Sequence, residues 1–103
     1  MKSVAKSLHF HPQVVADLEA AIEWYERVSP QTTEDFRTAA KAGLRAIGRS
    51  PKHHAVVFAE RELRTCHLKP FPYVIVYREL AEVVRILGIR HTASDMSSWI
   101  DRD

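Results

Sequence analysis

RTCHLKPFPYVIVYRELAEVVRILGIRH, at residues 64–91, is the stretch of this sequence that decides the fold. Its aliphatic, β-branched and aromatic residues fall into three runs of strand length, at residues 64–68, 73–78 and 83–90. Two prolines separate the first two runs, because proline donates no hydrogen bond to a sheet. The four residues ELAE between the last two runs suit a hairpin loop. We therefore predict a three-stranded antiparallel meander.

The sequence before this meander predicts a strand and two helices. Residues 6–10 alternate polar and apolar side chains, as in a short strand. Beyond Pro12, apolar residues recur at the spacing of one helical face, with Val15 among the first of them. Ser29 and Pro30 then offer an N-cap and a first turn for a second helix, with Thr32 or Thr33 as the alternative cap. The chain therefore opens with a strand and a helical hairpin.

We predict an α+β fold in which a helical hairpin, formed by residues 12–28 and 30–49, packs on one face of the sheet. The strand at residues 6–10 is expected at a sheet edge, and residues 52–60 are expected to form a loop. The other sheet face is expected to be open. Eight side chains are expected to be mostly buried: Leu18, Ile22, Tyr25, Phe36, Leu44, Ile47, Ile75 and Ile86.

Length and composition predict one ordinary globular domain over residues 1–103. No run approaches the ~18 apolar residues of a membrane span, and the first six residues lack the apolar core of an export signal. We therefore expect a cytoplasmic protein with no membrane partner. Cys66 is the only cysteine, so it cannot form an internal disulfide, and its place within a strand run favours a buried, inert thiol.

The sequence contains no motif for a cofactor or a metal. The three glycines form no phosphate-binding loop. Of the six histidines, His9 lies near His11 and His53 precedes His54, but neither pair has the i, i+4 spacing of helical metal ligands. We therefore expect no metal and no cofactor.

Charge is distributed unevenly along the sequence. Residues 1–35 carry three basic and six acidic side chains, a net charge of −3, whereas residues 36–103 carry twelve basic and seven acidic ones, a net charge of +5. The basic part contains the predicted sheet, which favours an anionic partner such as RNA, DNA or an acidic protein. The candidate binding residues are Arg37, Arg45, Arg64, Lys69, Arg78, Arg85, Arg90 and His91.

Strand alternation sorts these basic residues by sheet face. It places Arg85 and His91 on the same face of the last strand. A face that carries such cations can bind a phosphate backbone, or stabilise the charge that develops when a ribose 2′-oxygen attacks its phosphate. For Arg64 and Arg78, a structural role as ion-pair partners of nearby glutamates is an alternative.

Several motifs, in this order, resemble the RelE/ParE superfamily of bacterial toxins. FHP at residues 10–12 and DLEAAIEWYE at residues 17–26 resemble its opening helices, and FPY at residues 71–73 resembles its central hairpin. ILGIRH at residues 86–91, followed by Trp99, resembles its last strand and tail. The resemblance covers nearly the whole chain. It implies the strand–helix–helix–three-strand fold and the toxin half of a type II toxin–antitoxin pair.

Within that superfamily, the sequence is more similar to the ParE branch than to the ribonuclease branch. The ribonuclease branch relies on lysines and arginines along its second and last strands, but Thr65, His67 and Lys69 occupy the matching second-strand positions here. Ser94 stands where members usually carry an arginine, and no tyrosine follows Tyr77. The resemblance thus implies a ParE-like growth inhibitor of the plasmid-stabilisation type that acts on DNA gyrase and is not an enzyme.

Two alternatives remain open at this stage. The first is a RelE-like endoribonuclease that cuts ribosome-bound mRNA, with His67, Lys69, Arg85 and His91 as acid/base and phosphate-stabilising groups. The second is a degenerate, non-toxic binding module of the same fold, for which Ser94 is the best support. In each case the resemblance implies an acidic antitoxin as partner, in a toxin–antitoxin hetero-oligomer.

Overall fold

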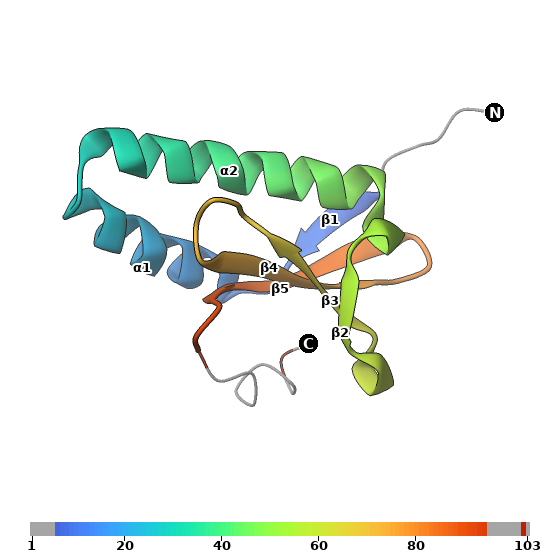
Figure 1. The fold of residues 1–103 in the computed structure, drawn as a ribbon. Coiled ribbons are helices and arrows are strands. Elements are labelled where there is room, and N and C mark those ends of the chain that lie inside the picture. Colours follow the sequence, from blue (N-terminus) through green and yellow to red (C-terminus); the bar gives the residue numbers. More distant parts are fainter. Residues whose placement is uncertain (1–5, 95–101, 103) are drawn as a thin grey trace.

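A computed structural model describes residues 6–94 and residue 102 of the chain. Within this part, two helices and five strands follow one another, with a 3₁₀ turn on either side of the second strand. The elements are β1 Ser7–Phe10, α1 Val14–Glu26, α2 Pro30–Arg49, η1 Pro51–His53, β2 Ala55–Phe58, η2 Ala59–Arg61, β3 Leu63–His67, β4 Tyr73–Glu79 and β5 Val83–His91. Both helices cover the same face of the sheet (Figure 1), as predicted.

The sheet has the strand order β1-β5-β4-β3-β2. β3, β4 and β5 form the predicted antiparallel meander, with Ile75 of the central strand opposite both Cys66 and Ile89. β1 forms one edge, as predicted, and runs parallel to β5, with Ser7 opposite Val83. The strand–helix–helix order and the antiparallel meander confirm the predicted α+β architecture.

One predicted loop contains a strand. β2 pairs with β3 within residues 52–60, so the loop prediction was wrong there. The strand is only four residues long, lies between two 3₁₀ turns, and has an irregular register between Val56 and Phe58. Its sequence, AVVF, has strand composition, but a run this short is hard to distinguish from a loop by pattern alone.

The connection between the helices is short, and hydrogen bonds close both the C-terminal end of α1 and the N-terminal end of α2. The α1 helix begins at Val14, later than predicted, and after its last turn the Val28 N–H donates to the Tyr25 carbonyl at 2.8 Å. Ser29 then caps α2, since its Oγ accepts a hydrogen bond from the Thr32 N–H at 3.0 Å. The chain therefore reverses direction within a few residues and places the two helices side by side.

The main core lies between the helical hairpin and the sheet. Phe36 is fully buried, and its ring centroid lies 5.1 Å from that of Tyr25 and 5.3 Å from that of Phe71. Six of the eight side chains predicted for the core are buried. The other two, Leu18 and Leu44, are half-buried and pack against the core.

The buried face of α1 differs from the prediction at its first turn. Val14 is 5% exposed, whereas Val15, predicted for the same face, is 63% exposed. Val28 is also exposed, because it lies in the tight turn beyond the end of the helix.

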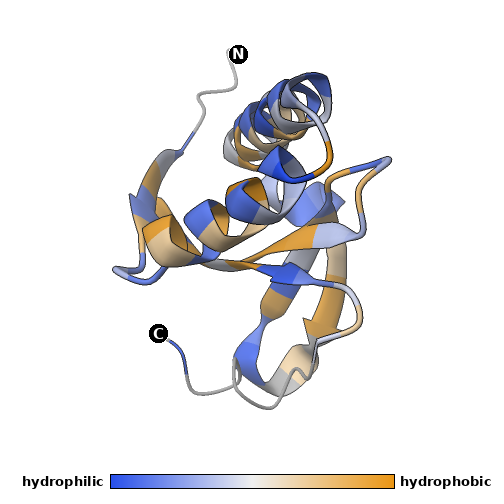
Figure 2. Cartoon of the chain, turned by 90° about the vertical axis from the view of Figure 1, so that its left-hand side faces the viewer, coloured by the Kyte–Doolittle hydropathy of each residue, from blue (hydrophilic) through white to orange (hydrophobic). Residues whose placement is uncertain are grey.

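In Figure 2 much of the outer surface of both helices has the blue, hydrophilic colour, while the strands beneath them carry much of the orange.

The α2 helix approaches the sheet most closely at Gly43. A Cβ atom at this position would lie 2.6 Å from Leu68 Cδ2 and 3.0 Å from Ile75 Cδ1. Both distances are shorter than ordinary carbon–carbon contacts, so a larger residue would push the helix outward or displace those two side chains. The glycine thus sets the separation of the two layers.

A β-bulge in β5 changes which residues face the helices. Tyr77 of β4 is opposite Ile86, whereas its neighbour Val76 is opposite Gly88, so Leu87 is the extra residue. The predicted alternation, which placed Arg85 and His91 on one face, is therefore wrong. The residues of β5 that follow Leu87 face the side of the sheet opposite to the one that simple alternation predicts.

An acidic side chain on α1 accompanies this bulge. Asp17 Oδ2 accepts a hydrogen bond from the Ile89 N–H at 3.2 Å and pairs with Arg102 Nη1 at 2.7 Å. The same Arg102 nitrogen donates to the Leu87 carbonyl at 3.1 Å. The Ile89 N–H and the Leu87 carbonyl, which would bond to a neighbouring strand in a regular sheet, are thus bonded to side chains instead.

The face of the sheet away from the helices is not left open, contrary to the prediction. It carries a second apolar cluster of Leu63, Val74, Val76 and Leu87, none of which is more than 8% exposed. Around this cluster lie polar and basic positions, including Thr65, which is opposite Val76. The sheet therefore has a buried apolar strip on each face.

Candidate functional site

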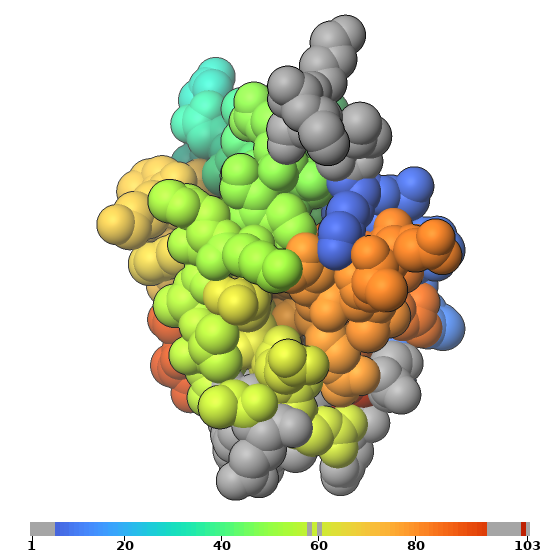
Figure 3. All heavy atoms as spheres, turned by 90° about the vertical axis from the view of Figure 1, so that its right-hand side faces the viewer, coloured from blue at the N-terminus to red at the C-terminus, as the bar shows by residue number. Residues whose placement is uncertain are grey.

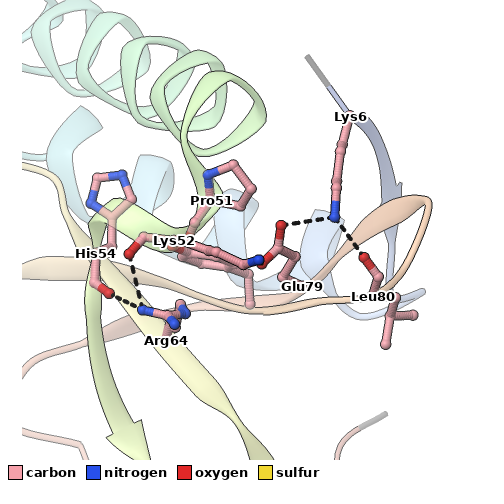
Figure 4. Close-up of polar contacts among 8 residues, drawn as sticks. Lys6, Pro51, Lys52, His54, Arg64, Glu79 and Leu80 are labelled. Carbon is pink, nitrogen blue, oxygen red and sulfur yellow. Dashed lines mark hydrogen bonds and ion pairs between the residues drawn. The ribbon is translucent and has the colours of Figure 1, made fainter. Parts of the chain in front are cut away.

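The main-chain turn after α2 is held by two side chains of the sheet (Figure 4). Arg64 of β3 donates from Nη1 to the His54 carbonyl at 2.6 Å and to the Lys52 carbonyl at 3.2 Å. Tyr77, opposite Arg64 on β4, donates its hydroxyl to the Pro51 carbonyl at 2.5 Å. Burial raises the pKa of Tyr77 well above its ordinary value, so the hydroxyl stays neutral and remains a donor. Arg64, a predicted binding residue, thus has a structural role.

A carboxylate next to this turn connects the first strand to the β4–β5 hairpin. Glu79 Oε2 lies 2.8 Å from Lys6 Nζ, and its other oxygen lies 3.8 Å from Lys52 Nζ. Lys6 Nζ also donates to the Leu80 carbonyl at 2.8 Å (Figure 4). The Glu79 side chain is only 13% exposed, so the shorter pair is shielded from solvent and holds β1 against the hairpin.

The imidazole of His54 lies in the same region and is poorly solvated. Its Nε2 is buried and has no hydrogen-bond partner, and its ring packs edge-on against Tyr77 with centroids 6.1 Å apart. Burial, followed by the charges of His53 and Arg64, lowers the pKa of His54 below its ordinary value. The ring is therefore neutral at physiological pH.

The four residues predicted for RNA cleavage do not converge. His67 is opposite Val74, and Arg85 is opposite Arg78, on the face of the sheet away from the helices. The two positions on β4 are four residues apart, roughly 13 Å along the strand. The His67 ring nitrogen Nε2 is within hydrogen-bond distance, 2.9 Å, of the Phe71 carbonyl.

His91 lies on the opposite side of the sheet from these two residues. It is opposite Tyr73, and the two rings pack edge-on with centroids 5.2 Å apart. Tyr73 itself packs against Phe36 of α2, which identifies this as the helix-covered side. Lys69 is exposed in the turn between β3 and β4. The bulge therefore separates His91 from His67 and Arg85.

Two further predicted binding residues bond to the main chain. Arg90 Nη1 donates to the Ser94 carbonyl at 2.7 Å, and the Ser94 hydroxyl donates to the His91 carbonyl at 2.6 Å. Arg78 donates from Nε to the Arg61 carbonyl at 3.1 Å. Ser94, at the position where an arginine is usual in the superfamily, thus closes a turn together with Arg90. Trp99, part of the predicted tail motif, lies outside the described residues.

The basic row of α2 has a different environment. Arg37 pairs with Glu34 at 3.4 Å, a contact between two exposed side chains. The side chains of Lys41, Arg45 and Arg49 make no ion pair and no hydrogen bond within the part of the chain that the structure describes. Of the predicted binding residues, Arg45 and Lys69 are therefore exposed and have no polar partner among the described residues.

Arg45 and Arg49 border a groove of about 370 Å³ between the C-terminal half of α2 and β1. Figure 3 looks at this side of the molecule, where the green end of α2 meets the blue β1. The remaining lining residues are Lys6, Leu8, Leu44 and Gly48. A groove beside the helical hairpin was expected from the sequence, but its lining was not, because the lining depends on where β1 packs. The only available signal was the i, i+4 row of basic residues.

The described residues provide little for metal or redox chemistry. No group of three or more potential metal ligands occurs among residues 6–94 and 102. Cys66 is buried, and burial raises the pKa of its thiol, which disfavours the reactive thiolate. No helix in the same residues is long and apolar enough to cross a membrane.

Comparison with known proteins gives consistent results. Residues 8–96 match a family model described as the ParE toxin of the type II toxin–antitoxin system parDE. Toxin ParE2 of Mycobacterium tuberculosis, from strains CDC 1551 and H37Rv alike, is 29% identical over 89 residues, which cover 85% of this chain and 83% of the relative. A solved structure of a chromosomal ParDE system from P. aeruginosa has the same fold, with a TM-score of 0.72 and 18% identity over 84% of this chain and 96% of that one.

Proposed function

Since the chain belongs to the ParE toxin family of type II toxin–antitoxin systems, we propose that it arrests growth by inhibiting DNA gyrase and that an acidic antitoxin neutralises it. In this proposal the protein binds its target and does not cleave RNA. The proposal combines the ParE-like motifs of the sequence with the arrangement of the basic side chains in the fold.

The observation that carries the proposal is the bulge in β5. General acid/base cleavage of RNA needs its proton-transfer groups within hydrogen-bond reach of one phosphate, and its cations beside the same group. His91 lies on the helix-covered side of the sheet, whereas His67 and Arg85 lie on the other side. This separation supports a binding function over a nuclease function.

An antitoxin partner is supported by the relatives and by charge. The structure from P. aeruginosa is described as a ParDE toxin–antitoxin system, and the Mycobacterium tuberculosis relatives are named toxins. Residues 36–103 of this chain carry a net charge of +5, which favours an acidic partner. A disordered acidic segment that orders on binding can wrap a large surface of such a toxin.

The proposal is tested with purified protein in two parallel assays, gyrase supercoiling and cleavage of mRNA on translating ribosomes. We expect inhibition of supercoiling and no mRNA cleavage. The triple variant His67→Ala, Lys69→Ala and His91→Ala should keep most of the growth arrest of the original chain. Loss of arrest in a variant that still folds and still binds the antitoxin would replace this proposal with the ribonuclease one. Activity in neither assay would favour a binding module.

A further inference from the structure

The strand β2 forms one edge of the sheet, since β3 is its only neighbour in the strand order (Figure 1). Its outward main-chain groups bond to no further segment among the residues that the structure describes. Its side chains are partly open to solvent as well, because Val56 is 47% and Val57 is 45% exposed. Unpaired N–H groups and carbonyls beside apolar side chains make such an edge a template for another strand.

The opposite edge of the sheet lacks this combination. The strand β1 has the sequence SLHF, in which polar and apolar residues alternate, and Lys6 directly precedes it. The strand β2 has the sequence AVVF, without a charged residue or a proline, the residue types that commonly block an exposed edge. Only its short length and its irregular register limit further pairing. Of the two edges, β2 is therefore the one more open to an added strand.

Opposite charges lie at the two ends of β2. Lys52 precedes the strand, Glu62 follows it, and both line a cavity of about 250 Å³ together with Val56. The Lys52 side chain is 78% exposed, and its only ion pair is a contact of 3.8 Å with Glu79. The Glu62 side chain makes no ion pair and no hydrogen bond within the described part of the chain. Both charges are therefore accessible to a partner that lies along this edge.

The backbone of Glu62 gives a second reason to consider its carboxylate. Its φ is 52°, in the left-handed region that residues other than glycine rarely adopt. Glycine or asparagine would occupy this conformation at lower cost, so the backbone alone does not explain a glutamate. Residues in such conformations are concentrated at functional positions. This favours a role for the carboxylate outside the fold of its own chain.

We propose that two copies of this chain pair along β2, antiparallel and related by a two-fold axis close to Val57. In an antiparallel pair the beginning of one strand lies beside the end of the other, so Lys52 of each copy meets Glu62 of the second. The valines form the apolar centre between these two ion pairs. An edge that pairs with itself closes the assembly at two copies, because neither β2 remains free. The inference is independent of the proposed gyrase inhibition and of its neutralisation.

The pair is expected to be weak. A strand of four residues buries less than the roughly 1,200–2,000 Å² that stable interfaces bury. We therefore expect a Kd on the order of 0.1 mM, in the range of transient contacts. The two ion pairs are exposed, so they contribute more to the orientation and the choice of partner than to affinity.

The test is sedimentation equilibrium of the full-length toxin without antitoxin, at concentrations up to about 1 mM. The original chain should associate to a dimer and no further. Val57→Lys should raise the Kd at least about tenfold, because it places a charge at the centre of the edge. Leu80→Lys is the matched control, since it adds the same charge at a leucine that is 42% exposed at the β4–β5 turn. It should leave the Kd unchanged, and circular dichroism checks that both variants fold.

Two single charge reversals test the ion pairs. Lys52→Glu and Glu62→Lys should each raise the Kd about fivefold in about 0.1 M salt, because both contacts of the dimer become repulsive. An equimolar mixture of the two variants should restore the original association, since a mixed dimer contains two attractive contacts. If the two residues interacted only within one copy, mixing the variants would restore nothing, and this result would contradict the proposed geometry.

Other outcomes also decide between the pairing and its alternatives. A toxin that stays monomeric up to about 1 mM would overturn the proposal, as would a dimer that Val57→Lys leaves intact. An extended segment of the antitoxin is the competing occupant of the edge. The toxin alone would then be monomeric while Val57→Lys weakened antitoxin binding, and that result also overturns the pairing. Gyrase inhibition by the original chain is measured separately, so a failure of the proposed function is distinguished from a failure of the pairing.

Discussion

The tip and the base of the helical hairpin are held by different chemistry. At the tip, where α1 turns into α2, the rings of Tyr25, Phe36 and Phe71 pack on one another. At the base, where α2 leads into η1, Arg64 and Tyr77 bond to main-chain carbonyls. The only titratable ring of this tip cluster is Tyr25, and burial raises the pKa of its hydroxyl, so it stays neutral at physiological pH. The base contains the imidazole of His54, whose ordinary pKa is near neutrality. The same motif thus has an end insensitive to pH and an end sensitive to it.

The surfaces of the two helices differ as well. The α1 helix carries four acidic and no basic side chains, whereas α2 carries two acidic and four basic ones. The acidic helix also exposes a large aromatic side chain near the tip, since Trp24 is 57% exposed. On charge alone, an acidic partner is therefore repelled by α1 and attracted to α2.

The largest effect is expected from removing the aromatic packing at the tip. Phe36→Ala should lower the free energy of unfolding by about 3–5 kcal/mol, because it leaves a cavity in a fully buried site. Urea denaturation measures the change. Trp24→Ala is the matched control on the other helix and should cost less than about 1 kcal/mol, because that ring is largely exposed. Similar losses for both would show that the tip is not held by this cluster.

A smaller effect is expected from the polar contacts at the base. Tyr77→Phe should lower the free energy of unfolding by about 1–3 kcal/mol, because the Pro51 carbonyl loses its donor in a partly buried place. Tyr73→Phe serves as the control, since the Tyr73 hydroxyl has no partner among the described residues, and it should change stability little. Identical melting temperatures for Tyr77→Phe and the original chain would contradict the role assigned to this hydroxyl.

The smallest effect concerns pH. The pKa of His54 is lowered below about 6.5 by burial and by neighbouring cations. As the pH falls through that value, the unfolded chain binds the proton before the folded one, so the free energy of unfolding decreases. His54→Gln removes this contribution, and the stability difference between about pH 7.5 and about pH 5.5 should become smaller. A Phe36→Ala variant should keep the original pH dependence. An unchanged slope in His54→Gln would contradict the shift.

Local sequence patterns predicted most of the elements, because each depended on neighbouring residues. The second helix begins where Ser29 and Pro30 indicate and ends at Arg49, as predicted, and the meander follows from three runs of strand composition. The first turn of α1 was less predictable, since Val14 and Val15 both fit the helical spacing. Only packing against β5 decides which of the two is buried.

The candidate site was harder to predict, because it depends on contacts between distant segments. The bulge that turns His91 away from Arg85 is bonded to Asp17 and Arg102, which lie far apart in the sequence. The availability of Arg45, compared with Arg64, depends on which carbonyls lie within reach in the folded chain. Strand alternation and charge counts contain neither kind of information.

The parallel pairing of β1 with β5 has a consequence for synthesis of the protein. Ser7 and Leu8 are made before the two helices, whereas their strand partners, Val83 and Val84, are made after them. We therefore expect the pairing of β1 with β5 to form after the helices and the rest of the meander, because contacts of such long sequence separation form slowly. The wall that Leu8 gives to the groove is completed only then. The nascent chain thus forms the groove only once β5 has been made.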